Sequence, residues 1–213
     1  MSDTDYLFDK YASKAGSDQI ASRLALRILS ELLEKYNPAT ILEIGSGIGT
    51  MTELILNKSP NSKIICYEKN AWCVTQLKKN VDLSNAKILT SEIHLQSINK
   101  LELIIIDDFV EKEILFTLIE KTQPSIVFIE GHRRRQRLHV AETFIRLKLN
   151  FTLRNYRKDK NSKKGGCVIF VDKNSKYQKY LWYFYLHAAL IYAKAQELRA
   201  KIHFRKYLGI SAK

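Results

Sequence analysis

Glycines at alternate positions follow an apolar run that contains an acid, early in the chain. Residues 41–44 are Ile-Leu-Glu-Ile, and the glycines after them are Gly45, Gly47 and Gly49. Backbone without side chains allows a ligand to lie directly against N–H groups at the start of a helix. The dinucleotide-binding fingerprint, G-x-G-x-x-G, requires glycine where this chain has Thr50. The pattern therefore favours a ligand that has no pyrophosphate.

Polar side chains also follow the later apolar runs. In an open α/β sheet, ligands bind beyond the carboxyl ends of the strands, so the residues at strand ends are the candidates for chemistry. These residues are Glu68, the pair Ser91 and Glu92, the pair Asp107 and Asp108, and Glu130 with His132.

The carboxylate of Asp107 could orient or deprotonate an acceptor molecule. Glu130 and His132 are two positions apart, so their side chains could point to the same side. A neutral His132 could then act as a general base on an acceptor hydroxyl. Two alternatives stay open. Asp107 and Asp108 could simply cap a helix that begins near Glu111, and Glu130 and His132 could be solvated loop residues.

Apolar runs alternate with segments of helical period, which predicts the elements that position these residues. A helix capped by Ser17 or Asp18 precedes the first strand, and further helices are expected at residues 72–81, 111–121 and 137–147. The last two strands follow each other without a helix and should be antiparallel. The predicted fold is α/β, a doubly wound and mostly parallel sheet of seven strands at residues 41–44, 63–67, 86–90, 101–106, 126–129, 151–156 and 167–171.

The chain resembles the class I S-adenosylmethionine-dependent methyltransferases. Their first motif is an acid followed by G-x-G-x-G, and residues 43–49, Glu-Ile-Gly-Ser-Gly-Ile-Gly, match it throughout. The family has a second acid at the end of the next strand, which accepts hydrogen bonds from both ribose hydroxyls, and Glu68 stands there. Seven strands with a closing hairpin also characterise the family. The resemblance covers about residues 17–173 and implies S-adenosylmethionine as the cofactor.

The resemblance also implies roles for individual residues. Glu43 would orient the glycine loop or meet the amino group of the cofactor, and Ser91 and Glu92 would contact the adenine ring. Asp107 would lie beside the donor methyl group. The expected cofactor-binding residues are Glu43, Gly45, Ser46, Gly47, Gly49, Glu68, Ser91, Glu92 and Asp107, and the expected catalytic residues are Asp107, His132 and Glu130.

For the methyl acceptor, the sequence predicts only the type of atom that is methylated and whether a metal takes part. The chain lacks N/D-P-P-Y, the motif of enzymes that methylate amino or amide nitrogens, which favours oxygen as the acceptor atom. In length and in its N-terminal helix the chain resembles the metal-dependent catechol-type O-methyltransferases. Their usual Asp-Asn pair is missing, which disfavours a divalent metal. If a metal were bound, its ligands would be Asp107, Glu130 and His132.

The chain carries a net charge of +13. Arg133, Arg134 and Arg135 follow the fifth predicted strand, and arginine binds carboxylate or phosphate through paired hydrogen bonds. We therefore expect these three residues to bind an anionic acceptor, a small or glycan-like molecule. The charge also leaves open an RNA methyltransferase, although no RNA-binding motif is recognisable. Fold resemblance itself does not identify the acceptor.

The end of the chain differs from the rest. Residues 176–213 include eight basic residues and one acid, Glu197. We expect an amphipathic helix that packs on its own domain or on a second subunit. The alternatives are contact with an anionic membrane surface, contact with nucleic acid, and a non-catalytic adaptor that uses the adenosylmethionine fold. The apolar face would comprise Leu181, Phe184, Tyr185, Ala188, Ile191, Tyr192, Ala195, Leu198 and Ile202.

Length and composition predict one α/β domain with an appendage. The domain would span residues 1–173, with a flexible N-terminus at 1–16, and the basic, aromatic helical extension would span 174–213. The start of the chain is polar and acidic, unlike a signal peptide, and no apolar run reaches the roughly 20 residues that span a bilayer. Cys66, Cys73 and Cys167 lack the spacing of a metal knuckle. We expect a cytoplasmic protein, peripheral to a membrane if the extension binds lipid.

Overall fold

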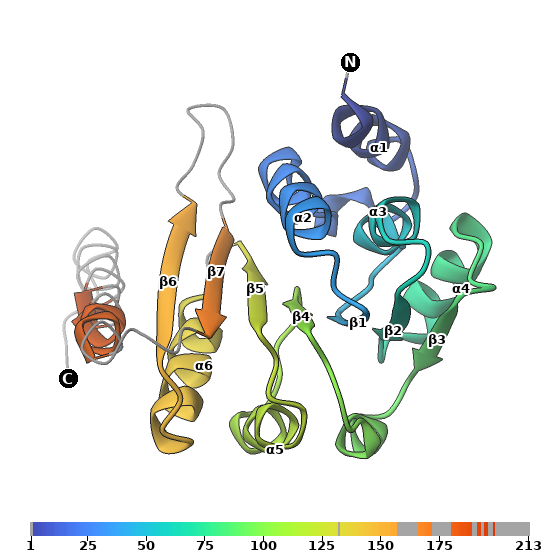
Figure 1. Cartoon of the computed structure of the whole chain (residues 1–213). Helices are drawn as coiled ribbons and strands as arrows, with labels where there is room; N and C mark the ends of the chain where they lie inside the picture. Colours follow the sequence, from blue (N-terminus) through green and yellow to red (C-terminus); the bar gives the residue numbers. More distant parts are fainter. Residues whose placement is uncertain are drawn as a thin grey trace, which may run out of the picture.

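The computed structural model describes residues 2–131, 133–156, 166–171, 180–188, 191–192, 194–195 and 198. Seven strands form one sheet in the order β3-β2-β1-β4-β5-β7-β6 (Figure 1). The strands β1 to β5 are parallel, while β7 pairs antiparallel with both β5 and β6. The predicted sheet and its closing hairpin are therefore confirmed. The strands are β1 Thr40–Ile44, β2 Lys63–Tyr67, β3 Ala86–Leu89, β4 Leu103–Ile106, β5 Ile126–Glu130, β6 Phe151–Tyr156 and β7 Gly166–Val171.

Helices cover both faces of this sheet (Figure 1). One face packs against α1 Asp3–Ala12, α2 Arg23–Tyr36, α3 Thr50–Lys58 and α4 Ala71–Asn80, and the other against α5 Lys112–Thr122 and α6 Arg134–Arg146. In β1, Ile41 belongs to the core on the face covered by α1 to α4, and Leu42 belongs to the core on the face covered by α5 and α6. A strand that is buried on both faces needs apolar side chains at consecutive positions, which explains the continuous apolar runs in the sequence.

The first helix of the doubly wound unit begins later than the sequence predicted. Ser17 and Asp18 belong to the short 3-10 helix Ser17–Gln19, and Ser22 is the residue that caps α2. Its Oγ accepts a hydrogen bond from the backbone N–H of Ala25 at 3.2 Å. The other end was predicted correctly, because α2 ends at Asn37 in a left-handed conformation before Pro38.

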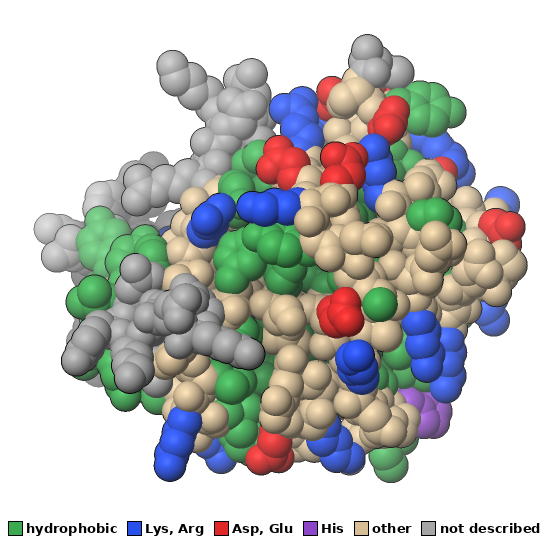
Figure 2. All heavy atoms as spheres, viewed as in Figure 1, with side chains coloured by type: hydrophobic (Ala, Val, Ile, Leu, Met, Phe, Trp, Pro, Cys, Tyr) green, Lys and Arg blue, Asp and Glu red, His purple; other side chains and the backbone are tan. Residues whose placement is uncertain are grey.

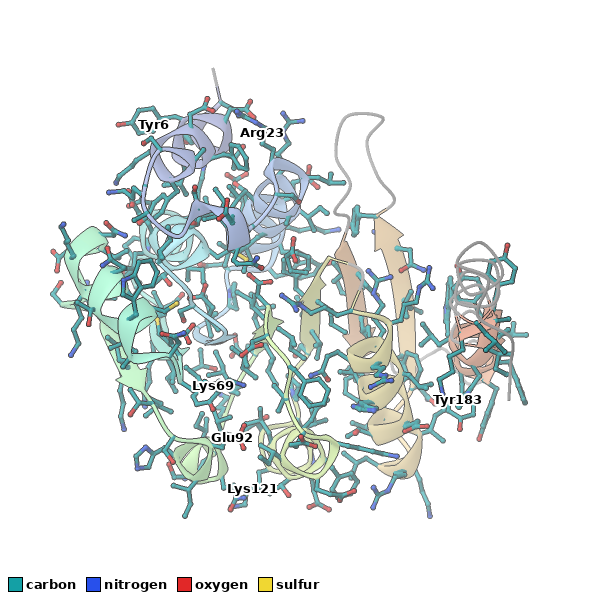
Figure 3. All side chains as sticks on the ribbon, turned by 180° about the vertical axis from the view of Figure 1, so that it is seen from behind. Tyr6, Arg23, Lys69, Glu92, Lys121 and Tyr183 are labelled. Carbon is teal, nitrogen blue, oxygen red and sulfur yellow. The ribbon has the colours of Figure 1, made fainter. Side chains whose placement is uncertain are left out.

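Residues 1–16 differ from the flexible segment that the sequence predicted. They include α1, in which Tyr11 is fully buried in the core next to α3. The Tyr11 hydroxyl donates a hydrogen bond to Glu53 Oε2 at 2.8 Å, and Lys10 Nζ donates to Glu53 Oε1 at 2.6 Å. Arg23 of α2 also pairs with Asp5 of α1 (Figure 3). Leu7 and Tyr11 are the buried pair that anchors this helix, and they were not recognised because the residues around them are polar.

The C-terminal extension is helical at residues 180–188, beside the sheet edge formed by β6 (Figure 1). Leu186 is buried, and Trp182 and Tyr183 pack against the same core as α6. The predicted apolar face is on the other side of the helix, where Leu181 and Phe184 are 70% and 68% exposed. These two side chains do not pack on their own domain, and the expected packing of this face on a second subunit stays a prediction. Within the described part of the chain, no helix is long and apolar enough to span a bilayer.

If α1 is an integral part of the fold, Tyr11→Ala should lower the free energy of unfolding by about 3–5 kcal/mol, as expected for removing a large buried ring. Tyr6→Ala is the matched control, because Tyr6 is on the same helix but is 59% exposed (Figure 3). The control should change stability by only about 0.5 kcal/mol. Urea unfolding of both variants measures the difference, and equally small effects would show that α1 is dispensable.

Candidate functional site

A cavity of about 460 Å³ opens at the carboxyl ends of β1, β2 and β4. The strand order reverses between β1 and β4, and α/β sheets bind ligands at this switch point. The volume lies within the range of about 300–1,000 Å³ that is usual for small-molecule sites. The strand-end and loop residues that line the cavity include Glu43, Gly45, Ser46, Gly47, Glu68, Lys69, Asn70, Trp72, Asp107, Asp108 and Arg133.

The glycine loop brings bare backbone to this cavity. Gly45 has a φ of +86°, and a Cβ there would lie 2.7 Å from Asp108 Cβ and 2.9 Å from the Asp108 backbone nitrogen. Any side chain at Gly45 would therefore push β1 away from the end of β4. At Gly47, by contrast, an added Cβ would have no atom within 4 Å. That open space leaves the loop accessible to a ligand.

Glu68 connects the end of β2 to the glycine loop. Its Oε2 accepts a hydrogen bond from the Gly47 N–H at 2.8 Å, and its Oε1 accepts one from the Asn70 N–H at 2.8 Å. The side chain is buried and lines the cavity, as the sequence predicted. Both oxygens are thus held in place by backbone donors before any ligand binds, and each retains a lone pair for a further hydrogen bond.

Glu43 is a fully buried acid beneath the same loop. Thr52 donates a hydrogen bond to its Oε2 at 2.6 Å, while its Oε1 has no hydrogen-bond partner. Burial raises the pKa of Glu43 to about 7, because the charged form is disfavoured away from water. An unsatisfied, buried carboxyl oxygen that lines the cavity is suited to a cationic or hydrogen-bond-donating group of a ligand.

Asp107 forms the acidic end of the cavity at β4. Arg133 Nη2 lies 2.6 Å from Asp107 Oδ1 and also donates to the Asp107 carbonyl oxygen. Burial and the charge of Glu130 raise the pKa of Asp107 well above its ordinary value, and Arg133 opposes that shift. The Glu130 side chain is itself buried, with no hydrogen-bond partner at its Oε1.

The alternative role of Asp107 and Asp108 as helix caps is not observed. Glu111 is the residue that precedes α5. Asp108 accepts a hydrogen bond from the Phe109 N–H at 2.7 Å, and Lys69 Nζ lies 3.3 Å from its Oδ2. Lys69, which follows β2, therefore brings a positive charge across the cavity to the end of β4 (Figure 3).

The structure divides the arginine run. Arg133 lines the cavity, whereas Arg134 and Arg135 are exposed and do not. Arg137 is buried and supports the fold, because it donates to the Gly131 carbonyl and, at 2.9 Å, to Asn155 Oδ1. Helix α6 begins at Arg134, one turn earlier than predicted, and this turns successive arginines in different directions.

Three further predictions have different outcomes. Ser91 and Glu92 lie after β3 but do not line the cavity. His132 lies outside the described residues. Across the residues that are described, no three potential ligand side chains form a metal cluster. Of the expected ligands, Asp107 pairs instead with the Arg133 guanidinium.

The sequence reasoning missed several residues that line the cavity. Lys69, Asn70 and Trp72 follow Glu68 directly, and Trp72 is 47% exposed at the start of α4. An exposed tryptophan just after a strand-end acid was the available signal. The loop before α2 also reaches the cavity, where Gly16 lies against Trp72, since a Cβ on Gly16 would come within 2.6 Å of the indole ring.

The Glu43 proton should affect the stability of the ligand-free protein. The folded state holds this proton up to a pKa of about 7, while the ordinary value is 4.5. Stability from that proton is therefore complete below pH 4.5 and decreases as pH rises through 7. Relative to Glu43→Gln, the wild type should lose about 2 kcal/mol between pH 5.5 and 8, at about 1.4 kcal/mol per pKa unit. Urea unfolding at both values measures this, and parallel losses in the two proteins would contradict it.

Comparison with known proteins finds a family model that covers these features. Residues 13–107 match the model of the methyltransferase small domain. This match includes the glycine loop, Glu68 and Asp107. No curated protein sequence matches the chain.

Solved structures share the fold at low sequence identity. An S-adenosylhomocysteine-bound methyltransferase from Podospora anserina has a TM-score of 0.59 at 14% identity, with 81% of this chain and 89% of that chain covered. An O-methyltransferase from Bacillus cereus, also with S-adenosylhomocysteine, gives 0.58 at 12%, covering 79% and 90%. A precorrin-6y C5,15-methyltransferase from Geobacter metallireducens gives 0.60 at 11%, covering 75% and 94%. The chain therefore matches the methyltransferase small domain over residues 13–107 and shares its fold with solved S-adenosylmethionine-dependent methyltransferases.

Proposed function

We propose that this methyltransferase acts on an oxygen atom of a small or glycan-like, anionic acceptor. The observation that carries the proposal is the pairing of the Asp107 carboxylate, whose side chain is 11% exposed, with Arg133 at the edge of the donor cavity. The Asp107 carboxylate can accept a proton, and the Arg133 guanidinium can bind an anion. Both side chains line the cavity at the carboxyl ends of the strands.

The donor half of the cavity fits S-adenosylmethionine. Glu68 supplies carboxylate oxygens for the ribose hydroxyls, and the Gly47 backbone leaves room beside it. The unpartnered Oε1 of Glu43 suits the amino group of the cofactor. Bound S-adenosylmethionine supplies an electrophilic methyl group on a positively charged sulfur. These three residues bind and orient that group, which is the main catalytic task in a direct displacement.

The acceptor half provides a base. The pKa of Asp107 is raised, and a higher pKa makes its carboxylate a stronger general base for a reaction near neutral pH. Asp107 accepts the hydroxyl proton of the acceptor while the acceptor oxygen forms its bond to the methyl carbon. Bound S-adenosylmethionine would supply the methyl group and would keep the electron pair of its broken carbon–sulfur bond as a neutral thioether. Atoms and charge thus balance without a metal.

Arg133 provides the acceptor's counter-charge. In the structure its Nη2 donates to Asp107 Oδ1 and to the Asp107 carbonyl oxygen, while its buried Nε has no hydrogen-bond partner. A carboxylate or phosphate on the acceptor would offer the same guanidinium a second anion, so Asp107 would be released to act as the base. The structural neighbours include methyltransferases that act on oxygen and on carbon, so the choice of oxygen rests on this carboxylate rather than on the fold.

The net charge of +13 favours RNA as a second candidate acceptor. A filter-binding titration with bulk RNA separates the two proposals, because neutralised phosphates make affinity fall steeply as salt rises. An RNA enzyme should show such a slope and methylate RNA. The proposed small-molecule enzyme should methylate none.

Cofactor binding should depend on Glu68. Replacing it by alanine removes a charged hydrogen-bond acceptor and the tie to Gly47, which should weaken S-adenosylhomocysteine binding about 10-fold to 100-fold. Isothermal titration calorimetry measures the affinity. Glu113→Ala, an exposed acid on α5, is the matched control and should bind as the wild type does. Absence of binding by the wild type would instead favour the non-catalytic adaptor.

Acceptor chemistry should depend on Asp107 and Arg133 in different ways. In a radiolabelled-methyl assay over phenolic, sugar and RNA acceptors, Asp107→Asn should lower kcat about 100-fold or more and remove the rise of rate with pH. Arg133→Gln should raise KM for anionic acceptors only. Arg134→Gln changes an exposed neighbour that does not line the cavity and should alter KM less than about twofold. Equal effects of the two arginine variants would contradict the role of Arg133.

A further inference from the structure

The helix at residues 180–188 has apolar side chains on two opposite faces. The inner face packs on the domain through Trp182, Tyr183 and Leu186, and His187 Nε2 lies 3.6 Å from Glu142 Oε1 of α6. The outer face, which we define as Leu181, Phe184, Tyr185, Ile191, Tyr192 and Leu198, is between 46% and 70% exposed.

Leu181 lies three and four residues before Phe184 and Tyr185, and Ile191, Tyr192 and Leu198 follow Phe184, Tyr185 and Ile191 at steps of seven, a spacing that is typical of one side of a helix. Hydrophobic side chains gather at the surface where this helix lies (Figure 2). Large apolar side chains that stay exposed together usually mark a binding surface, whereas scattered ones need no explanation. The inner face anchors the helix, whereas Leu181, Phe184 and Ile191 of the outer face are 70%, 68% and 67% exposed.

Charge indicates which partner fits. Residues 176–213 contain eight basic residues and one acid, and the whole chain carries +13. A second copy of the chain would bring the same positive charge against this segment. An anionic lipid surface, in contrast, attracts lysine and arginine and accepts leucine, isoleucine and phenylalanine at the boundary of its acyl chains. Tyrosine rings such as those of Tyr185 and Tyr192 suit the headgroup level.

We propose that the outer face binds the surface of an anionic bilayer and holds the methyltransferase domain there as a peripheral protein. The proposal does not depend on which acceptor is methylated. It differs from the packing of the extension on its own domain, which the inner face performs.

Co-sedimentation of the full chain with vesicles tests the proposal. The protein should sediment with vesicles that contain phosphatidylserine in phosphatidylcholine, and much less with phosphatidylcholine alone. The double variant Leu181→Ser and Phe184→Ser should reduce the partition coefficient about tenfold or more, because two large apolar side chains lose their insertion. Ile93→Ser is the matched control, since Ile93 is 68% exposed on a different element, and it should bind as the wild type does.

Several results would overturn the proposal. These are no sedimentation with either kind of vesicle, equal sedimentation of the double variant, or a loss in the Ile93→Ser control as large as in the double variant. Sedimentation velocity without lipid tests whether a second copy of the chain covers the outer face instead. A wild-type dimer that dissociates in the double variant would show that the outer face is a dimer interface and would overturn the proposal. Circular dichroism checks that the double variant is folded. If the double variant is not folded, a second double variant on the same face, Ile191→Ser with Leu198→Ser, replaces it.

Discussion

The close approach of β1 to the end of β4 at Gly45 is the constraint on which the site depends. A Cβ on Gly45 would come within 3 Å of both the Asp108 side chain and its backbone. Because nothing occupies that space, the glycine loop after β1 and the acids after β4 form one cavity. Glu68 completes the arrangement from β2 by accepting the Gly47 N–H. The acids and the bare backbone that line the cavity therefore come from three adjacent strand ends.

The site gathers buried negative charge in a protein that is strongly positive overall. Glu43 and Glu130 are buried and the Asp107 side chain is 11% exposed, and burial raises the pKa of Glu43 and of Asp107. Buried charges are costly unless they are paired, and here the paired one is Asp107, through Arg133. The unpartnered oxygens of Glu43 and Glu130 remain as unsatisfied groups that a bound cation or donor would relieve. A positively charged sulfonium donor is well matched to such surroundings.

The glycine loop and Glu68 could be predicted from the sequence because the rules that place them are local, whereas Ser91 and Glu92 were expected at the cavity and do not line it. Glycine spacing follows from the need for bare backbone, and Glu68 follows from its position after a buried strand. The acceptor half could not be predicted to the same degree. The direction of each arginine depends on where α6 begins, and a shift of one turn sends Arg133 to the cavity and Arg137 into the fold. Similarly, the position of α1 depends on two residues, Leu7 and Tyr11, within a polar segment.

The C-terminal helix shows a further limit of periodicity. A helical apolar stripe indicates that one face avoids water, but it does not identify the surface that covers it. In residues 180–188, Trp182 and Leu186 pack inward while Leu181 and Phe184 face outward, so aromatic and aliphatic residues occupy both sides. The inner face could not be recognised in the sequence as a continuous apolar pattern, because Tyr183 and His187, which carry polar atoms, lie on it. The structure therefore separates two roles that the sequence pattern combined: one face holds the helix to the domain, and the other is left for a partner.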